Sequence, residues 1–408
     1  MNASLPTLIS VEEAWTHIQT GVTLMPEVSC PLEEAHGRVL REPIHADRDL
    51  PPFDRATLDG VAISSEAWRA GVREFAVEGE QPAGAPPGSI AHPHGCLEIM
   101  TGAPLPRGAD CVVRIEDVTI RNGRALIGGN AQAAPMDGVH PRGSDHAKGD
   151  LLLSAGRRLR AAQIAIAASV NAAQLTVSRQ PSVAIVATGD ELVSPGAPAA
   201  AHQVRLSNTY ALRAALACSG YPDVSSFHLT DNYDILYCNL AEILKERDVL
   251  VLTGGVSMGK RDFVPAVLEA LGVRPVFHKV KQRPGKPLWF GLAPGGKPVF
   301  GLPGNPVSAL VGFYRYVLPA LEHMIGAEAG PREVARLDAD VRFEPDLTLF
   351  MPAAAWFDDD GTMWASPRPV NTSGDVAGLA EVDGVVELER TRNVFPKGMA
   401  AVFHRFTG

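Results

Sequence analysis

The stretch VAIVATGDEL, Val183–Leu192, decides the fold of the central part of this 408-residue chain. Its first five residues are apolar, which is typical of a strand buried on both faces of a parallel sheet. Two similar runs follow, DVLVL at 248–252 and PVFGL at 298–302, and helical patterns separate the three strands. Strands that alternate with helices predict a doubly wound α/β domain with a parallel sheet.

Cap residues predict where two helices of this domain begin. Ser207 is expected to cap a helix that runs to Cys218, and Gly220 is expected to end it. Asn305 as the cap, with Pro306 at the first helical position, begins a long helix.

The regions on either side of this centre have a different character. A capping box of Ser10 and Glu13 predicts an N-terminal helix. Short apolar runs between Pro, Gly and Asp clusters predict a β-rich region over about 30–150. The alanine-rich stretch Ala161–Val170 is typical of a buried helix, and the residues after the linker Gly326–Arg332 predict a small β domain.

Composition excludes several classes of protein. Hydrophobic residues make up 46% and charged residues 20% of the chain, so it is not disordered. The net charge of −9 argues against a nucleic-acid binder, and five cysteines without CxxC spacing argue against a disulfide framework or a structural zinc site. The most apolar stretch, Val299–Leu321, contains three prolines and an arginine and is not a membrane span. A signal peptide begins with a basic segment, but no lysine or arginine precedes Arg38. We therefore expect a soluble cytoplasmic protein without membrane contact.

Three glycine-rich loops follow the three strands. They are TGDE (188–191), TGGVSMG (253–259) and PGNP (303–306). Ligands of open α/β sheets bind beyond the carboxyl ends of the strands, and glycines let the backbone approach an anion there. These loops predict an anion site, although glycine and proline also simply make tight turns.

A basic segment, KVKQRPGKP at 279–287, lies in the same domain. On an extended strand a spacing of two places Lys279, Lys281 and Arg283 on one face. Together with Lys286 they would suit phosphate or another tetrahedral oxyanion. The alternative is a solvated edge strand, in which lysine discourages aggregation.

Four carboxylates accompany the loops: Asp190, Glu191, Asp231 and Asp262. In an anion site, carboxylates suggest a bridging divalent cation, Mg²⁺ above all, or a general base. Asp190 and Asp262 could instead cap helices. The chain has no GxxxxGK[ST], GxGxxG or GxSxG motif, so the common nucleotide-binding and serine-hydrolase interpretations fail.

Two motifs of the β-rich region are explained by neither helix nor strand periodicity. LPPFDRATLDGVAI (50–63) contains Asp54 and Asp59, and IMTGAPLPRGADCVVRIED (99–117) contains Thr101 in a stretch rich in proline and glycine. Each of them alone would be interpreted as a loop.

Together these strings resemble the molybdopterin molybdenumtransferase family, bacterial MoeA and the E domain of gephyrin. The matching motifs, in chain order, are PPFD-x3-LDG, IMTGAPLPRGAD, RGSD (142–145), VAIVATGDEL, LSN (206–208), LTGGVSMG, RPGKP (283–287) and GLPGNPVSA (301–309). The resemblance implies that molybdenum, supplied as molybdate, enters the dithiolene of adenylyl-molybdopterin with Mg²⁺ and that AMP is released. It also implies a homodimer, with each active site between the α/β domain of one subunit and the β-rich insert of the other, and a hand-off from a molybdopterin adenylyltransferase.

The resemblance further implies four domains. We expect domain I, extended, at 1–27 with 44–53 and 141–178; β-rich domain II at 28–43 with 54–140; α/β molybdopterin-binding domain III at 179–326; and barrel-like domain IV at 327–408.

Functional residues are carried over from the family motif by motif. The expected catalytic or pterin-site residues are Asp59, Thr101, Asp145, Glu191, Asp231 and Asp262, with Asp231 and Asp262 also holding the metal. The expected binding residues for adenylate and phosphates are Asn208, Gly254, Gly255 and Ser257. Those expected to hold molybdate are Arg283, Lys286, Ser308 and the loop of Pro303, Gly304 and Asn305.

Three departures from the family pattern leave two other hypotheses open. The residues around the LDG motif differ, Lys260 stands where an acidic residue is common, and Leu347–Trp356 lacks the arginine expected to help hold molybdate. Lys260 and the segment without arginine motivate the hypothesis of a catalytically impaired paralogue that carries molybdopterin. A weaker alternative is a pterin- or nucleotide-binding hydrolase that shares only the α/β domain.

Overall fold

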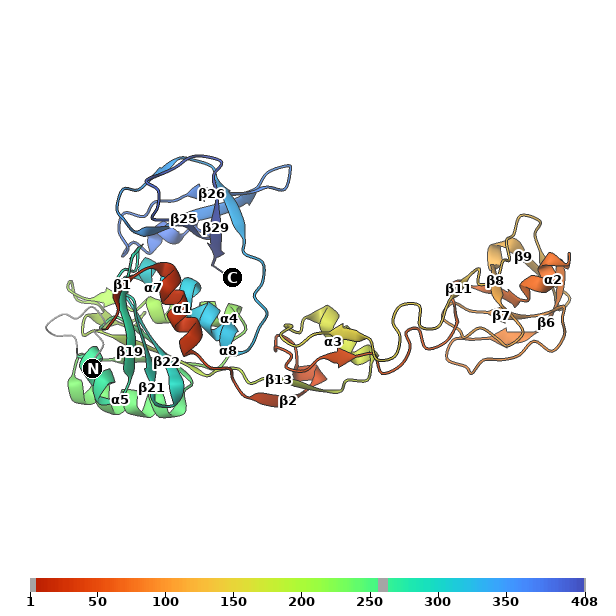
Figure 1. Ribbon diagram of the computed structural model, residues 1–408, viewed down its shortest axis with the longest axis horizontal. Coiled ribbons are helices and arrows are strands. Elements are labelled where there is room, and N and C mark those ends of the chain that lie inside the picture. The colour runs from red at the N-terminus through yellow and green to blue at the C-terminus, as the bar shows by residue number, and fades with distance from the viewer. Residues whose placement is uncertain (1–4, 256–262, 407–408) are drawn as a thin grey trace.

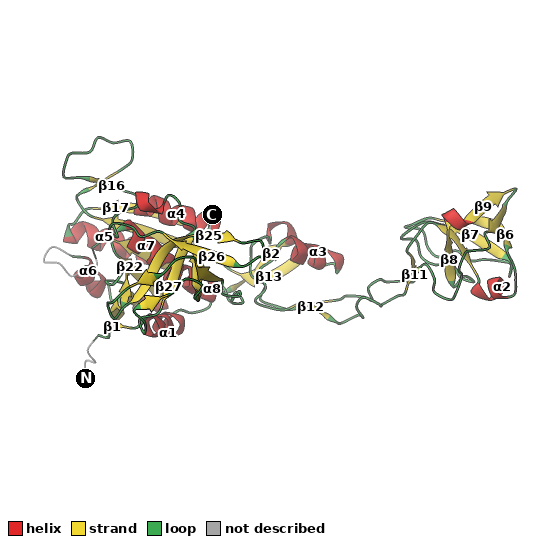
Figure 2. Cartoon of the chain, turned by 90° about the horizontal axis from the view of Figure 1, so that it is seen from above, coloured by secondary structure: helices red, strands yellow, loops and turns green. Residues whose placement is uncertain are grey.

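The computed structural model describes residues 5–255 and 263–406, and the chain is elongated (Figure 1). An α/β unit and a small β unit lie together at one end, an extended region follows, and a β-rich unit lies at the far end of long connecting segments. Figure 2 shows the same separation from above. The arrangement confirms the expected multidomain α/β fold.

The α/β unit contains a seven-stranded sheet. Its strands in spatial order are β1 (Thr7–Ile9), β19 (Arg274–Val280), β21 (Trp289–Ala293), β22 (Lys297–Leu302), β18 (Val249–Thr253), β14 (Val183–Thr188) and β17 (Val224–Leu229). The last four are parallel, as predicted, but β21 runs antiparallel to both neighbours. The sheet is therefore mixed, because a short turn at Pro294–Gly296 joins β21 to β22 in place of a helical crossover.

Helices cover both faces of this sheet. They are α1 (Val11–Gly21), α4 (Asn208–Cys218), α5 (Tyr233–Glu246), α6 (Val264–Ala270), α7 (Pro306–Gly312) and α8 (Leu318–Met324), with a π-helical turn at Phe313–Val317 between the last two. In β14, Val183 and Ile185 join the core under α4 and α7, whereas Ala184 and Val186 join the core under α5 and α6. Both faces are buried, which explains why the strand is apolar from Val183 to Ala187.

The N-terminal helix forms as predicted but packs elsewhere than expected. Glu13 N–H donates to Ser10 Oγ at 3.1 Å, and Ser10 N–H donates to Glu13 Oε2 at 2.7 Å, which completes the capping box. Val11 and Ile18 are fully buried in the core of the α/β unit. This segment, expected in domain I, therefore belongs by its packing to the α/β unit.

Two predicted helix caps stand at the expected positions but do not make the expected hydrogen bonds. Ser207 and Asn305 occupy the cap positions of α4 and α7, but neither side chain accepts a capping hydrogen bond. Asn305 instead donates from Nδ2 to Ser373 Oγ at 2.8 Å, so a contact with the C-terminal unit replaces the cap.

The extended region is built from segments far apart in sequence. It contains β2 (Glu27–Pro31), β3 (Ile44–His45), β12 (Leu151–Leu153), β13 (Gln174–Ser178) and α3 (Ala161–Ser169). β2 pairs with β13, and Cys30 and Leu40 pack against Leu175. Residues 28–43, expected in domain II, thus lie in this region. α3 is mostly exposed rather than buried, with Ala167 its one buried residue, because the region has too few elements to enclose a helix.

The β-rich unit contains one six-stranded sheet. Its strands in spatial order are β8 (Cys111–Arg114), β5 (Gly60–Ile63), β7 (Gly95–Ile99), β6 (Glu74–Gln81), β10 (Arg124–Ile127) and β9 (Val118–Arg121), with helix α2 (Ser65–Arg69) and the pair β4 (Arg55–Ala56) and β11 (Val139–His140) beside it. Phe75 and Cys96 lie in its core.

The C-terminal unit contains a closed barrel. Strands β25 (Thr348–Phe357), β26 (Met363–Pro367), β23 (Val334–Leu337), β29 (Ala400–Arg405) and β27 (Gly384–Leu388) pair in that order, and β27 pairs back onto β25. A short strand, β20 (Gln282–Arg283), leaves the α/β unit and pairs with β25. Beside the barrel, β24 (Val341–Arg342) and β28 (Val394–Phe395) form a separate two-stranded sheet. In the α/β unit, β15 (Leu192–Val193) and β16 (Val204–Arg205) form another.

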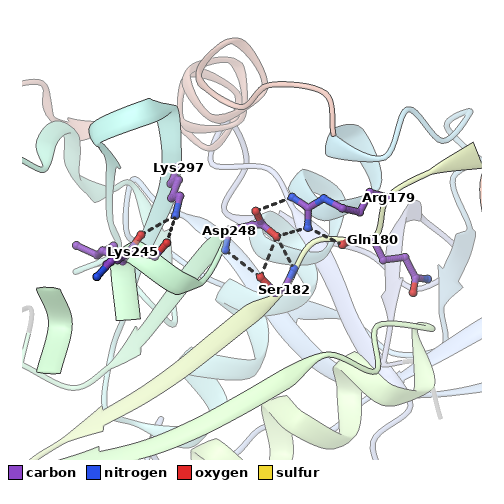
Figure 3. Close-up of polar contacts among 7 residues, drawn as sticks. Arg179, Gln180, Ser182, Lys245, Asp248 and Lys297 are labelled. Carbon is purple, nitrogen blue, oxygen red and sulfur yellow. Dashed lines mark hydrogen bonds and ion pairs between the residues drawn. The ribbon is translucent and has the colours of Figure 1, made fainter. Parts of the chain in front are cut away.

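An ion pair fixes the amino ends of β14 and β18. Arg179 contacts both carboxylate oxygens of Asp248 at 2.7 and 2.8 Å, and Ser182 donates to the same carboxylate from N–H and Oγ (Figure 3). Burial alone would raise the pKa of Asp248, but these hydrogen bonds outweigh it and lower the pKa to about 2. The ionised carboxylate therefore stabilises the fold above the ordinary value of 3.8, and this contribution is lost as the pH falls through about 2.

Asp248→Asn is expected to weaken β14 and β18 locally. At neutral pH the free energy of opening of these strands should fall by about 1–2 kcal/mol, discounted for partial exposure. Hydrogen exchange of the peptides 183–188 and 249–253 measures it, and the difference should shrink below about pH 4. Asp223→Asn is the control, because Asp223 pairs with Arg247 with 62% of its side chain exposed. Equal protection in Asp248→Asn and the parent protein would contradict this assignment.

No helix in the described part of the chain is both long enough and apolar enough to span a membrane. All five cysteines are free thiols; Cys30, Cys96 and Cys111 are buried.

Candidate functional site

The three predicted loops meet at the carboxyl edge of the sheet. Thr253 at the end of β18 lies in register with Ala187 of β14 and Leu302 of β22. Gly254 N–H donates to Leu302 O at 3.2 Å, which ties the second loop to the third. The first loop differs from the expectation, since TGDE leads into β15 and not directly into a helix.

Asn208 joins two of these loops. Its Nδ2 donates to Thr253 Oγ1 at 2.6 Å and to Gly304 O at 2.8 Å, so the side-chain donors are used within the protein. Asn208 Oδ1 and Thr188 Oγ1 are buried and have no hydrogen-bond partner among the described residues. Unpaired buried polar atoms carry a desolvation cost, so these two point to a ligand that would satisfy them.

Gly254 leaves space beside this pair of atoms. Its φ is +90°, and a Cβ there would lie 2.8 Å from Thr188 O and 3.4 Å from Thr188 Oγ1. Gly255 also has a positive φ, +69°. We call Thr188, Asn208, Thr253, Gly254 and Gly304 the edge cradle. Ser257 lies outside the described residues.

Two of the four predicted acidic residues, Asp190 and Asp231, meet through a backbone contact. Asp231 N–H donates to Asp190 Oδ1 at 3.1 Å, and His228 Nε2 lies 2.9 Å from Gly189 O beside it. Glu191 is exposed in the same loop, whereas Asp262 lies outside the described residues. Within residues 5–255 and 263–406, no three His, Cys, Asp or Glu side chains form a metal-binding group. Mg²⁺ held by substrate phosphates needs only one or two carboxylates, and Asp190 and Asp231 offer that donor set.

A pocket of about 660 Å³ opens between the α/β unit and the barrel. We call it the interdomain pocket. Five of the predicted oxyanion-site residues line it: Arg283, Lys286, Pro303, Asn305 and Ser308. Gly304 of the same loop faces the edge cradle, so the Pro303–Pro306 loop separates the two sites and contributes to both.

The C-terminal unit supplies further pocket residues. They are Arg342, Phe343, Leu347, Leu349, Phe350, Met351, Pro352, Pro369, Val370, Asn371, Thr372 and Ser373. Five of them belong to Leu347–Trp356, the segment that lacks the expected arginine, and the sequence motifs mark none of the others. The missing signal is the pairing of β20 with β25, which brings the barrel to the basic segment.

The basic segment is not one continuous strand. Lys279 has a φ of +68° at the end of β19, and β20 then joins a different sheet. The expectation that Lys279, Lys281 and Arg283 share one face of a strand is therefore wrong. Only Arg283 and Lys286 of the four basic residues line the interdomain pocket.

A buried pair of polar side chains holds the loop that carries these two residues. Gln282 is fully buried and donates from Nε2 to Pro284 O at 3.1 Å and Gly285 O at 3.4 Å. Tyr316 Oη donates to Gln282 Oε1 at 2.5 Å. Burial raises the pKa of Tyr316, so the hydroxyl remains a donor at all working pH values.

Tyr316→Phe is expected to destabilise the protein by about 1–3 kcal/mol, because Gln282 Oε1 would remain buried without its donor. The loop behind Arg283 and Lys286 would also be held less firmly, so an oxyanion such as phosphate should bind beside them severalfold more weakly. Thermal denaturation and calorimetric titration with phosphate measure the two effects. Tyr210→Phe, at an exposed tyrosine of α4, should change neither; unchanged stability in Tyr316→Phe would contradict the role of the pair.

The two motifs of the β-rich unit pack against each other. Thr101 donates to Asp59 Oδ1 from its N–H at 2.7 Å and from Oγ1 at 2.9 Å, and Gly102 N–H donates to Ala56 O. The hydrogen bond from the Thr101 backbone, aided by its hydroxyl, lowers the pKa of Asp59. Asp59 and Thr101 are both exposed, so an ionised carboxylate faces outward from this unit.

Asp145 lies at the junction of the β-rich unit and its connecting segments. His140 Nε2 contacts Asp145 Oδ1 at 2.9 Å, and Arg55 Nη2 lies 3.2 Å from His140 Nδ1. Arg142 of the same RGSD motif donates from N–H to Asp54 Oδ1 at 2.8 Å, so two predicted motifs meet here.

The predicted residues thus form two separate groups. Asp59, Thr101 and Asp145 belong to the β-rich unit and its junction, whereas Arg283, Lys286 and the edge cradle belong to the opposite end of the chain (Figure 1). A single chain does not bring the two groups together.

Comparison with known proteins finds matches over nearly the whole chain. It matches the MoeA N-terminal region (domain I and II) over residues 9–171, the probable molybdopterin binding domain over 184–323 and the MoeA C-terminal region (domain IV) over 334–403. A molybdopterin molybdenumtransferase of Synechocystis sp. is 36% identical over 398 residues, which are 97% of this chain and 100% of the relative. One of Bacillus subtilis is 33% identical over 88% of this chain and 84% of the relative.

A solved structure shares the fold over the same length. The molybdopterin biosynthesis MoeA protein of Pyrococcus horikoshii has a TM-score of 0.81 and 32% identity, and the match covers 98% of this chain and 100% of that one. Matches of this length contradict the hypothesis that only the α/β domain is shared. The chain therefore belongs to the molybdopterin molybdenumtransferase family.

Proposed function

We propose that this chain is an enzyme that inserts molybdenum from molybdate into the dithiolene of adenylyl-molybdopterin and releases AMP. The observation that carries the proposal is the interdomain pocket, which lies beside the edge cradle and holds Arg283 and Lys286 but no acidic side chain among the described residues. An oxyanion and a phosphorylated ligand can then bind on the two sides of one loop. Oxygen atoms of molybdate would leave as water as the dithiolene sulfurs bind molybdenum, and water would open the phosphoanhydride bond to AMP.

The chain's own residues divide the binding work. Arg283, Lys286 and Ser308 would hold molybdate in the interdomain pocket. The edge cradle would take the adenylate and phosphates: Thr188 Oγ1 can donate to a phosphate oxygen, and Asn208 Oδ1 can accept from a hydroxyl of the ligand. In this account Asn208 chiefly positions the Gly304 loop, since both hydrogen bonds from Nδ2 stay within the protein.

We propose Mg²⁺ as the metal, held by Asp231 and Asp262 as the family motifs imply, with Asp190 beside Asp231. When bound, the ion would offset negative charge on the phosphoanhydride. Asp190 and Asp231 by themselves keep two loops together at the edge where the phosphates would lie.

We propose that two copies of the chain form each complete site. The β-rich unit lies far from the interdomain pocket of its own chain (Figure 2), so Asp59 and Thr101 reach a pocket only in a partner. In a symmetric dimer each chain would then give its β-rich unit to the other. A molybdopterin adenylyltransferase is the expected donor of substrate, and the reaction is expected in the cytoplasm.

The alternative is a carrier that binds molybdopterin without turnover. It is favoured by Leu347–Trp356, which has no arginine and lines the pocket with apolar side chains. The experiment that separates the two incubates the purified protein with adenylyl-molybdopterin, Mg²⁺ and molybdate and measures AMP by chromatography. The proposal predicts AMP release that depends on molybdate; tight pterin binding without release would identify the carrier.

A further inference from the structure

The interdomain pocket contains a third basic residue that no sequence motif marks. Arg342 of β24 lines it together with Arg283 and Lys286, and no Asp or Glu of residues 5–255 and 263–406 belongs to its lining. The protein as a whole carries a net charge of −9, so three cations around one pocket reverse the general balance. Such a concentration of charge favours an anionic occupant.

Among the described residues, Arg342 is the one charged side chain that the C-terminal unit gives to the pocket. The rest of that wall is made by Phe343, by apolar residues from Leu347 to Pro352, and by the segment 369–373. Without Arg342, the positive charge would come from the α/β unit alone. An anion held by cations on both walls would also bind the two units to each other.

The backbone around Arg342 is fixed while its guanidinium is left available. Arg342 pairs in register with Val394 of β28, and Phe343 N–H donates to Asn393 O at 2.9 Å. Val341 beside it is 6% exposed, which anchors the strand. The guanidinium has no ion pair or hydrogen bond to any other residue of the described chain, unlike Arg390 and Arg405 of the same unit, which pair with carboxylates.

We propose that Arg342 is an oxyanion-binding residue and supplies the barrel's half of the molybdate site. The inference rests on the proposed function and extends it. A planar guanidinium can donate two parallel hydrogen bonds to two oxygens of one tetrahedral dianion, while Arg283 and Lys286 contact it from the other wall. Leu347–Trp356 then needs no arginine, because the charge arrives from the neighbouring strand pair.

The test compares Arg342→Gln with the full-length parent enzyme. We expect the molybdate KM to rise about tenfold or more, because a charge-assisted contact is lost from a pocket without competing acids. The kcat should change less than about threefold, and the KM for adenylyl-molybdopterin should stay the same. Arg342→Lys should recover part of the affinity, since it keeps the charge and loses the two-pronged geometry.

Arg392→Gln is the matched control, because Arg392 is exposed in the same unit and does not line the pocket. Calorimetric titration of each protein with molybdate alone gives a readout that is independent of turnover. A parent enzyme that turns over while Arg342→Gln keeps its molybdate KM would overturn this inference and leave the proposed function standing. A parent protein that neither binds molybdate nor releases AMP would refute the proposed function itself.

Discussion

Lys286→Gln is expected to lower kcat/KM for molybdate by at least about 100-fold without unfolding the protein. The ammonium group lies in a pocket that no acidic side chain of the described chain lines, so an oxyanion there would depend on it for charge. Lys286 makes no ion pair with another described residue, so its removal leaves no carboxylate unpaired. Steady-state kinetics at saturating adenylyl-molybdopterin measures the loss.

The matched control for this change is Lys281→Gln. Lys281 belongs to the same basic segment but does not line the pocket, so its loss should alter kcat/KM less than about threefold. Lys286→Arg should retain part of the activity because it keeps the charge. If Lys281→Gln were as damaging as Lys286→Gln, the general charge of the segment would matter rather than the pocket.

Asp59→Asn is expected to reduce kcat by at least about 100-fold while the protein keeps its stability. The Thr101 contacts lower the pKa of Asp59, so it is ionised at neutral pH, and its exposed position means that no core is disturbed. A carboxylate held by two hydrogen bonds and facing outward is expected to act on a group outside its own chain. Turnover and thermal denaturation, measured together, separate loss of function from unfolding.

Thr101→Val is the graded comparison for Asp59. It removes the hydroxyl bond and keeps the backbone N–H bond, so a loss of about tenfold is expected. Glu74→Gln is the control, because Glu74 is an exposed acid of the same unit that pairs with Arg124. Full activity in Asp59→Asn would remove the β-rich unit from the reaction.

Periodicity in the sequence predicts the central sheet because burial demands it. Every residue of β14 is buried, and alternate side chains enter two cores, so the strand is apolar up to Ala187, the residue before the candidate site. The antiparallel β21 could not be predicted in this way, since an apolar run does not state its direction. The path of residues 1–43 also depends on which distant segments β1 and β2 pair with, and no local pattern records that.

The candidate site likewise contains residues whose meeting the sequence predicts and residues whose place it does not predict. Loops that follow parallel strands meet at one edge by geometry, so the meeting of Gly254, Gly304 and Asn208 follows from the order of strands and helices. Arg342 is different, because only the pairing of β20 with β25 brings the barrel against the basic segment. The spacing of the basic residues along 279–283 gives a wrong prediction for a related reason. Lys279 has a positive φ, so the segment is not one regular extended strand.

Heterodimers of two inactive variants test most directly whether one active site is built from two chains. Asp59→Asn and Lys286→Gln chains with different affinity tags are coexpressed, and the dimers that carry both tags are purified. A site shared between chains restores one intact site of the two, because one chain gives the unaltered β-rich unit and the other the unaltered pocket. The account predicts about half of the parent activity per dimer; activity as low as that of either variant alone would contradict it.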